Sequence, residues 1–322
     1  LGENQDDIVV NSTHQLTLTQ IDGRGGADTA VVAEDRNVEG VRGELRFDLG
    51  NGINDLLIDD VNDSSGDNID INAYDLLDPD NAAQTRSIGI EGVAQGNIYY
   101  RADGGFLPQD GLVLRAGSGN NRIDIRNIHN SDHTEVYAGA NDDTVTVYNF
   151  DITGRSPTLT IYGEAGSDFI DASLSPIFVS LFGNLPGQNV TEGMADEDIL
   201  IGSEYDDIIE ANGGNDIVIG NFGNDKIDSG DGDDISLGDR GAVVMTNPLA
   251  AGVNGQRVSV SSTDNEVGGR DTIMGGNGDD LIIGGAGSDI IDGGSGNDGL
   301  IGDVGVARYN SGVQSSIEAS PF

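Results

Sequence analysis

The sequence has 322 residues, with 56 acidic against 15 basic side chains and a formal net charge of −41. A surface this acidic repels phosphate, which argues against nucleic acid or anionic membrane as a partner. The absence of cysteine excludes disulfides and thiolate metal sites, and no apolar run approaches the roughly 18 residues of a membrane-spanning helix. Self-repulsion among the carboxylates should destabilise a folded chain, so the charge itself indicates bound cations.

Residues 1–190 are predicted to form a parallel β-helix-like solenoid. Five segments place alternating apolar and polar residues on both sides of a glycine-rich acidic corner, which is the period-two signature of strands. These segments are 16–32, 45–58, 112–125, 134–147 and 159–172. The corners contain Asn121, Asp143 and Asp168, and the intervals between them are too long for a roll with two short strands in each coil. This spacing predicts a coil of about three short strands.

Two stretches fit this pattern less well. Within residues 59–111, the segment INAYDLLDPDNAAQ is interpreted as a loop or a short helical turn, and GNIYYRADGG as another strand. Residues 173–197 contain Pro176 and Pro186 and are interpreted as the transition between two kinds of solenoid.

Aspartates recur every nine residues from Asp198 to Asp234, and in most copies an apolar residue follows two positions later. The same steps return in a second run, from Asp271 to Asp298. Residues 191–322 are therefore predicted to form a β-roll in two blocks, 198–238 and 268–305. The inserted residues 239–267 form a loop or a hairpin that should stand off the roll. Because the second block is followed by only a short segment, the parent protein is expected to continue with more such units.

The clearest repeat runs from Gly275 to Ile301 as GGNGDDLII, GGAGSDIID and GGSGNDGLI, three copies of G-G-x-G-x-D-x-U-x in which U is a large apolar residue. The glycines allow a tight turn, and the last three residues of each copy form a short strand. If two copies make one coil, residues 18 apart stack, which aligns Asp280 with Asp298 and Asp271 with Asp289. A flexible glycine-rich linker is the alternative, but linkers do not keep Asp and Ile in register.

Stacked strands lie about 4.8 Å apart. Carboxylates and turn carbonyls at that spacing can enclose a cation that takes 6–8 oxygens at about 2.3–2.6 Å, which describes Ca²⁺ better than Mg²⁺.

Residues 198–301 resemble the RTX β-roll, a family of secreted calcium-binding modules built from this nonapeptide. The resemblance is clearest from Asp271 to Ile301. It implies that the sixth-position aspartates and the turn carbonyls bind Ca²⁺. The implied ligands are Asp207, Asp216, Asp225, Asp234, Asp271, Asp280, Asp289 and Asp298. Asp143 and Asp168 lie in similar corners, but no adjacent nonapeptide supplies a second wall, so solvated turn residues are the preferred interpretation there.

The expected fold is all-β, a parallel β-helix or β-solenoid continuing into a calcium β-roll. RTX rolls occur in toxins, proteases, lipases, epimerases, adhesins and surface-layer proteins, so the fold does not fix the function. The resemblance implies a module that folds at the calcium concentration outside cells. We expect an extracellular, calcium-stabilised structural or adhesive segment of a large repetitive surface, matrix or filament protein. Its partners would be calcium ions, neighbouring repeats of the same or a sister chain, and glycans, without nucleic acid or membrane insertion.

An enzyme is the alternative, in which the β-helix is a secreted polysaccharide lyase or epimerase and the roll aids secretion and folding. A third possibility is the calcium-folding tail of a toxin or lipase. The HExxH and GxSxG motifs are absent, and His129 and His133 are interpreted as a surface loop pair. Side chains suited to an acidic sugar form one cluster, for which outward-facing solvated residues are the preferred interpretation. They are Tyr99, Tyr100, Arg101, Arg115, Arg122 and Arg126.

Overall fold

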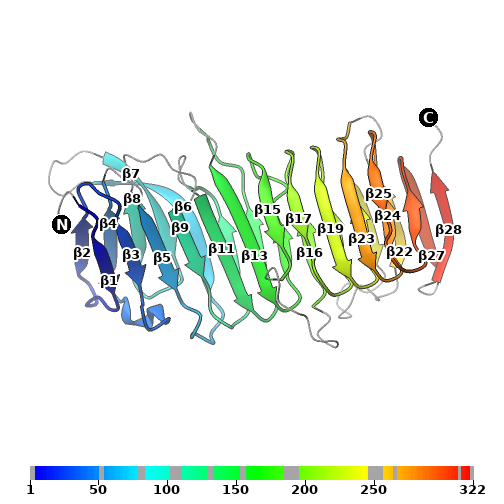
Figure 1. Ribbon diagram of the computed structural model, residues 1–322. Helices are drawn as coiled ribbons and strands as arrows, with labels where there is room; N and C mark the ends of the chain where they lie inside the picture. The colour runs from blue at the N-terminus through cyan, green and yellow to red at the C-terminus, as the bar shows by residue number, and fades with distance from the viewer. Residues whose placement is uncertain are drawn as a thin grey trace. The chain divides into compact units, whose positions relative to one another are not determined.

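The computed structural model describes residues 4–50, 54–77, 84–101, 111–128, 133–152, 157–184, 196–245, 257–263, 267–310 and 313–319. The chain divides into two compact units, Leu1–Ile161 and Tyr162–Phe322. Apart from one 3-10 turn at Val38–Gly40, every regular element in the described residues is a β-strand (Figure 1). Within this part of the chain, no helix is long and apolar enough to cross a membrane. The predicted all-β class is confirmed.

The first unit is built on two sheets. Its strands are β1 (Asp7–Val10), β2 (Leu18–Asp22), β3 (Thr29–Val32), β4 (Glu44–Asp48), β5 (Asp55–Asp59), β6 (Asn68–Leu77), β7 (Gln84–Glu91), β8 (Ile98–Arg101), β9 (Gly111–Arg115), β10 (Arg122–Ile125), β11 (His133–Ala140) and β12 (Thr144–Val147). One sheet has the order β1-β3-β5-β9-β11, and the other has the order β2-β4-β8-β7-β6-β10-β12. Alternate residues point inward, which explains the period-two pattern of the sequence.

The coils of this unit contain two strands rather than the predicted three. Gly111 pairs with His133 in one sheet, and Arg122 pairs with Thr144 in the other, so one coil holds a single strand of each sheet. The strands here are four to eight residues long, whereas most strands of the nonapeptide coils have three. The longer interval between corners therefore reflects longer strands and not an additional one.

An antiparallel excursion interrupts the parallel coils of the first unit. Strand β6 pairs antiparallel with β7, and β7 pairs antiparallel with β8. These strands lie between Leu56 and Leu112, which nevertheless pair as neighbours. The loop or helical turn predicted for 71–84 is therefore wrong where the structure describes it, because residues 71–77 continue β6. The strand predicted around Ile98 is confirmed as β8.

The second unit also has two parallel sheets, and it adds a third, antiparallel one. Its strands are β13 (Thr158–Ala165), β14 (Phe169–Asp171), β15 (Val179–Phe182), β16 (Ile199–Ile201), β17 (Ile208–Glu210), β18 (Ile217–Ile219), β19 (Lys226–Asp231), β20 (Ile235–Leu237), β21 (Gly241–Met245), β22 (Arg257–Ser262), β23 (Thr272–Asn277), β24 (Leu281–Ile283), β25 (Ile290–Asp292), β26 (Gly299–Ile301), β27 (Gly305–Asn310) and β28 (Val313–Ala319). The sheet orders are β13-β15-β17-β19-β23-β25, β14-β16-β18-β20-β24-β26 and β21-β22-β27-β28.

Residues 18 apart stack in the nonapeptide coils, as predicted. Ile199 pairs with Ile217, and Leu281 pairs with Gly299, each pair in parallel register. The register also continues across the inserted segment, where β19 pairs with β23 and β20 pairs with β24. The two predicted blocks therefore join as consecutive coils of one roll.

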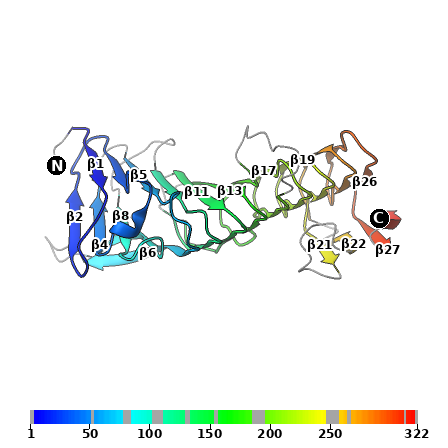
Figure 2. The same cartoon turned by 90° about the horizontal axis from the view of Figure 1, so that it is seen from below.

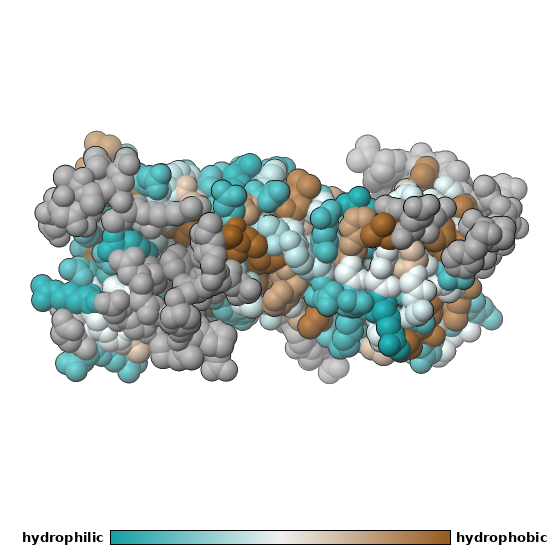
Figure 3. All heavy atoms as spheres, turned by 90° about the horizontal axis from the view of Figure 1, so that it is seen from above, coloured by the Kyte–Doolittle hydropathy of each residue, from teal (hydrophilic) through white to brown (hydrophobic). Residues whose placement is uncertain are grey.

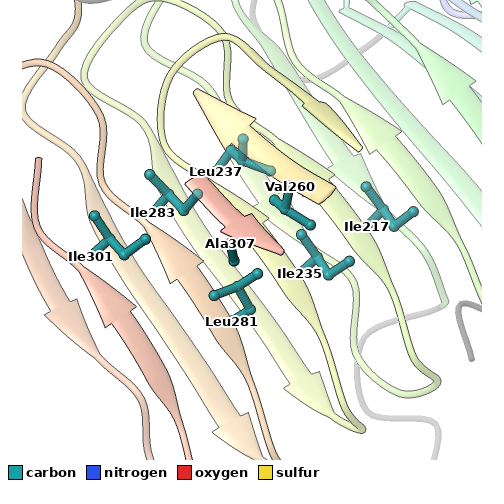
Figure 4. Packing of buried hydrophobic residues seen from close by; sticks show 8 residues of the cluster. All are labelled: Ile217, Ile235, Leu237, Val260, Leu281, Ile283, Ile301 and Ala307. Carbon is teal, nitrogen blue, oxygen red and sulfur yellow. The ribbon is translucent and has the colours of Figure 1, made fainter. Parts of the chain in front are cut away.

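The inserted strands β21 and β22 pair antiparallel, and β22 pairs in turn with β27 (Figure 2). The prediction that this inserted segment stands off the roll is wrong. Fully buried Val260 of β22 and Ala307 of β27 pack against the roll side chains Ile235, Leu237 and Leu281 (Figure 4). Packing of this kind removes apolar surface from water, which stabilises the roll on that side.

Most apolar side chains at the inward positions of the coils are fully buried, among them Ile209, Val218 and Ile282. The last coil differs, since Leu300 at the equivalent position is 47% exposed. On the face drawn in Figure 3, hydrophobic residues are dispersed among hydrophilic ones. Scattered exposure of this kind is ordinary for a folded surface.

Candidate metal centre

Most nonapeptide turns have left-handed backbone at two positions. In the ideal copies both are glycines, such as Gly276 with φ of 106° and Gly278 with φ of 137°. In the first block, Asn212 adopts φ of 78° at the first of these positions, and Gly214 follows with φ of 136°. Asn tolerates this conformation better than most residues. This less glycine-rich copy therefore still forms the same turn, whereas the turn before Asp207 has no left-handed residue at these positions.

The sixth-position aspartates are joined by a ladder of hydrogen bonds that runs from coil to coil. In each step, Oδ1 accepts the main-chain N–H of the corresponding residue one coil earlier, at 2.7–3.2 Å. The donor and acceptor pairs are Asp168–Asp198, Val179–Asp207, Asp198–Asp216, Asp207–Asp225, Asp216–Asp234, Asp225–Asp271, Asp234–Asp280, Asp271–Asp289 and Asp280–Asp298. Two columns result, one on each side of the roll, and the predicted alignments of Asp280 with Asp298 and of Asp271 with Asp289 are both present.

The second carboxylate oxygen of most ladder residues is buried without a protein donor. This applies to Oδ2 of Asp198, Asp216, Asp225, Asp271, Asp280 and Asp289. A buried, bare carboxylate oxygen is costly unless a positive charge or a hydrogen-bond donor meets it. Six such oxygens at repeating positions therefore point to a ligand that satisfies all of them in the same way.

The space beside most of these Oδ2 atoms is kept open by a glycine. A methyl group added at Gly238 would lie 2.3 Å from Oδ2 of Asp271 and 2.4 Å from the carbonyl oxygen of Gly284, one coil later. Gly275 has the same relation to Oδ2 of Asp280, at 2.4 Å, with a second glycine carbonyl at 2.6 Å. Carboxylate and carbonyl oxygens thus converge on one point in successive coils. An all-oxygen donor set of this kind fits Ca²⁺, which prefers such ligands in flexible geometry.

Burial is the main electrostatic feature of the columns. It raises the pKa of Asp225 to about 9 and that of Asp271 to about 7, with like-charged neighbours in the column adding to the effect. The pKa values of Asp198 and Asp216 are raised well above the ordinary value for the same main reason. A bound cation reverses this effect, because an opposite charge within about 4–6 Å favours the ionised carboxylate.

Two of the predicted ligands differ from the others. The hydroxyl and the main-chain N–H of Ser203 both donate to Oδ2 of Asp207, so this oxygen already has protein partners. Asp298 accepts the N–H of Asp280 at 3.2 Å, but it lies in the last coil of its column within the described residues. The first site therefore has a competing donor, and the last lacks a following coil.

The predicted ligand set leaves out Asp198, which the structure places in one of the two columns. The interpretation of Asp143 and Asp168 as solvated turn residues is wrong, because both side chains are buried. Asp198 is fully buried, and its Oδ1 accepts the N–H of Asp168 at 2.8 Å. Asp198 stands nine residues before Asp207, so the spacing alone could have included it. The second wall expected to be missing beside Asp168 is supplied by the coil of Asp198. A longer connection between these coils concealed the relationship.

The cluster considered for an acidic sugar is distributed over both sheets of the first unit, and its polar groups are engaged by protein partners. The hydroxyl of Tyr99 donates to Glu91 at 2.7 Å, and a guanidinium nitrogen of Arg101 lies 2.7 Å from Asp48. Arg126 is ion-paired with Asp70 and Asp124, and Arg122 with Asp124. Arg115 lies over the ring of Tyr137. Tyr100 is buried.

The imidazole of His133 contacts Glu135 and Thr158, at 3.0 and 2.5 Å. His133 is the first residue of β11, so the predicted loop position is wrong for this residue. His129 lies outside the described residues.

Comparison with known protein families agrees with the geometry of the roll. The family model of the RTX calcium-binding nonapeptide repeat matches four segments, 160–174, 192–227, 210–244 and 267–300. The chain therefore carries RTX calcium-binding nonapeptide repeats, and it is a calcium-binding repeat protein with parallel β-solenoid architecture. A comparison with curated proteins finds no match.

Proposed function

We propose that the protein is an extracellular, calcium-stabilised structural or adhesive solenoid segment of a larger repetitive surface, matrix or filament protein. Calcium ions in this proposal lie between successive coils of the roll. The proposed ligands are Asp207, Asp216, Asp225, Asp234, Asp271, Asp280, Asp289 and Asp298, together with turn carbonyls, and Asp198 joins them. The observation that carries the proposal is the row of buried, unpartnered Oδ2 atoms facing carbonyl oxygens of the next coil.

Calcium would act here as a folding ligand. The chain carries a net charge of −41, and the ladder places carboxylates of successive coils one above the other. A cation that binds only the folded roll stabilises it by mass action, since the unfolded chain has no assembled site. Concentrations of calcium outside cells would then favour the folded state, which supports an extracellular location.

The architecture supports a structural role. In a solenoid each coil contacts mainly its neighbours, so stability accumulates along the stack and further coils can extend it. Strands β25 and β26 end their sheets in the described part of the chain, and Leu300, which occupies an inward position in β26, is 47% exposed. A neighbouring repeat of the same or a sister chain would cover this edge, and glycans are further candidate ligands of an adhesive segment.

Calcium titration of the metal-depleted full chain tests the folding role directly. Circular dichroism should show β-structure appearing with calcium, and the melting temperature should rise with calcium concentration. Magnesium at equal concentration is the matched control, because its smaller octahedral shell suits this site poorly. An identical melting curve in calcium and in chelator would contradict the proposal.

Electron microscopy with and without calcium tests the structural role separately. Filaments, layers or ordered multimers in calcium would support it. Monomers at every calcium and protein concentration would contradict self-assembly while leaving calcium-dependent folding intact.

A further inference from the structure

A second kind of acidic site lies in the first unit, in the loop that follows β5. Asp60, Asp63 and Asp67 each place one carboxylate oxygen within 4.8 Å of the others. The loop lies outside the segments that match the nonapeptide family model. Proximity of acidic groups alone does not make a site, so the environment of each carboxylate decides the question.

Asp60 supplies the decisive observation. Its side chain is almost completely buried, at 1% exposure. Oδ1 accepts the main-chain N–H of Val38 at 2.9 Å, whereas Oδ2 is buried with no hydrogen-bond partner. Oδ2 of Asp67 is also buried without a partner. Two bare carboxylate oxygens therefore belong to one group of three carboxylates, and leaving them unsatisfied is costly.

The surrounding charges do not compensate for this burial. Burial and the neighbouring charges of Asp63, Asp67 and Glu39 raise the pKa of Asp60 to about 7. The adjacent guanidinium of Arg36 is directed to Asp59, 3.1 Å from its Oδ2. A divalent cation would neutralise the negative charge of the three carboxylates, and their oxygens are the ligand atoms that such a cation prefers.

The loop is held in place by bonds to neighbouring coils. The N–H of Asp63 donates to the carbonyl of Asp60 at 2.8 Å, and the N–H of Ser118 donates to the carbonyl of Asp63 at 2.7 Å. The N–H of Asp67 donates to Oδ1 of Asn121 at 2.9 Å. The three carboxylates are therefore positioned by the main chain, on one side by the coil of Val38 and on the other by the coil of Ser118 and Asn121. A rigid arrangement of this kind lowers the cost of closing around an ion.

The geometry points to a divalent-cation site formed by Asp60, Asp63 and Asp67, of the class that takes Ca²⁺. The donors are oxygens throughout, which favours Ca²⁺ over zinc or copper. Unlike the sites of the roll, this one is built from a single loop and contains no nonapeptide turn. Its ion would join the two ends of this loop, which hydrogen bonds already attach to the coils on either side.

Anomalous diffraction from crystals of the full chain grown in calcium tests this site without any substitution. The expected result is a calcium peak among the three carboxylates, in addition to peaks in the roll. Peaks in the roll without one at this loop would overturn the inference and leave the proposed function standing. A peak at this loop without any in the roll would do the reverse.

Ion counting by native mass spectrometry provides a second test. The double variant Asp60→Asn with Asp67→Asn should bind one calcium ion fewer than the wild type. Asp35→Asn, which removes an exposed charge from the same unit, should leave the count unchanged. If the double variant does not fold, Asp63→Asn alone provides the test, because its carboxylate is partly exposed and contributes less to folding. This variant should weaken calcium binding at the site at least tenfold, because one charged ligand is lost. An unchanged count and affinity in a folded variant would overturn the inference.

Discussion

The main-chain N–H of Asp225 donates a hydrogen bond to Oδ1 of Asp271 at 2.8 Å, although the two residues are 46 positions apart. The preceding step of the same column, from Asp207 to Asp225, has a hydrogen bond of the same length and spans only 18 positions. The inserted chain therefore leaves the column intact. Aspartates of both blocks therefore form one continuous column. The predictions below for calcium binding and stability depend on this continuity.

Asp225→Asn should have opposite effects with and without calcium. In chelator, the variant should be more stable than the wild type, on the order of 2 kcal/mol, because a buried ionisable group becomes neutral. In saturating calcium it should be less stable, and calcium affinity should fall at least tenfold, because a charged ligand is lost. Chemical denaturation in both conditions measures the two effects.

Asp228→Asn is the matched control for this variant, because it removes an equal charge from the strand that follows Asp225, outside the carboxylate columns. It should change stability by less than about 0.5 kcal/mol in either condition. Equal destabilisation of Asp225→Asn with and without calcium would show that the carboxylate does not hold an ion.

Gly238→Ala should obstruct one site by steric means. The added methyl group would lie 2.3 Å from Oδ2 of Asp271 and 2.4 Å from the carbonyl oxygen of Gly284. Forcing these atoms apart should cost about 1–3 kcal/mol, and it should reduce the number of bound calcium ions by at least one.

Gly302→Ala is the control, since nothing lies within 4 Å of the added group at the equivalent position of a later repeat. It should leave both stability and ion count near the wild-type values. Isothermal titration calorimetry measures the ion count, and a normal count in Gly238→Ala would contradict the assigned site.

The pH dependence of stability should change sign with calcium. Folded pKa values of about 7 for Asp271 and about 9 for Asp225 exceed the ordinary unfolded value of about 3.9. In chelator, the folded state therefore binds more protons than the unfolded state. Its stability should be greatest near pH 4, and it should fall as the pH rises through 7 towards 9.

With saturating calcium the trend should reverse over the acidic range. Ion binding requires ionised carboxylates, so lowering the pH releases calcium and lowers stability. Melting temperatures measured from pH 4 to pH 9 in both conditions check the two trends. Parallel curves with and without calcium would contradict the coupling between proton and calcium binding.

The antiparallel sheet should contribute to the stability of the roll through its buried face. Val260→Ala removes a fully buried side chain from the cluster formed with Ile235 and Leu237. The expected loss is about 2 kcal/mol, from two methylene equivalents and the cavity they leave. Val244→Ala, in the neighbouring strand, is the control because its side chain is 48% exposed. Equal effects of the two substitutions on the melting temperature would show that the sheet does not support the roll.

The nonapeptide coils could be predicted in detail because each repeat has the same length. A fixed nine-residue step determines both the register and the column in which each aspartate lies. The alignment of Asp280 with Asp298 follows from this count alone. Asp198 stands in the same nine-residue step, although it was not among the predicted ligands.

The first unit was less predictable because its coils vary in length. The interval from Asn121 to Asp143 does not reveal whether a coil contains two strands or three, since strand length and strand number compensate. The antiparallel pairing of β6, β7 and β8 could not be predicted, because their alternation of apolar and polar residues is the same as in a parallel strand. Asp60 carries no local signal, because its burial is created by the coil of Val38 and not by its immediate neighbours.

The long step between Asp225 and Asp271 shows that one corner of the roll accommodates an insertion longer than a whole coil without loss of register. Longer connections cost little additional entropy once the ends are fixed. This corner is therefore a natural place to graft a foreign peptide or a small domain, which calcium would present or release as the scaffold folds and unfolds.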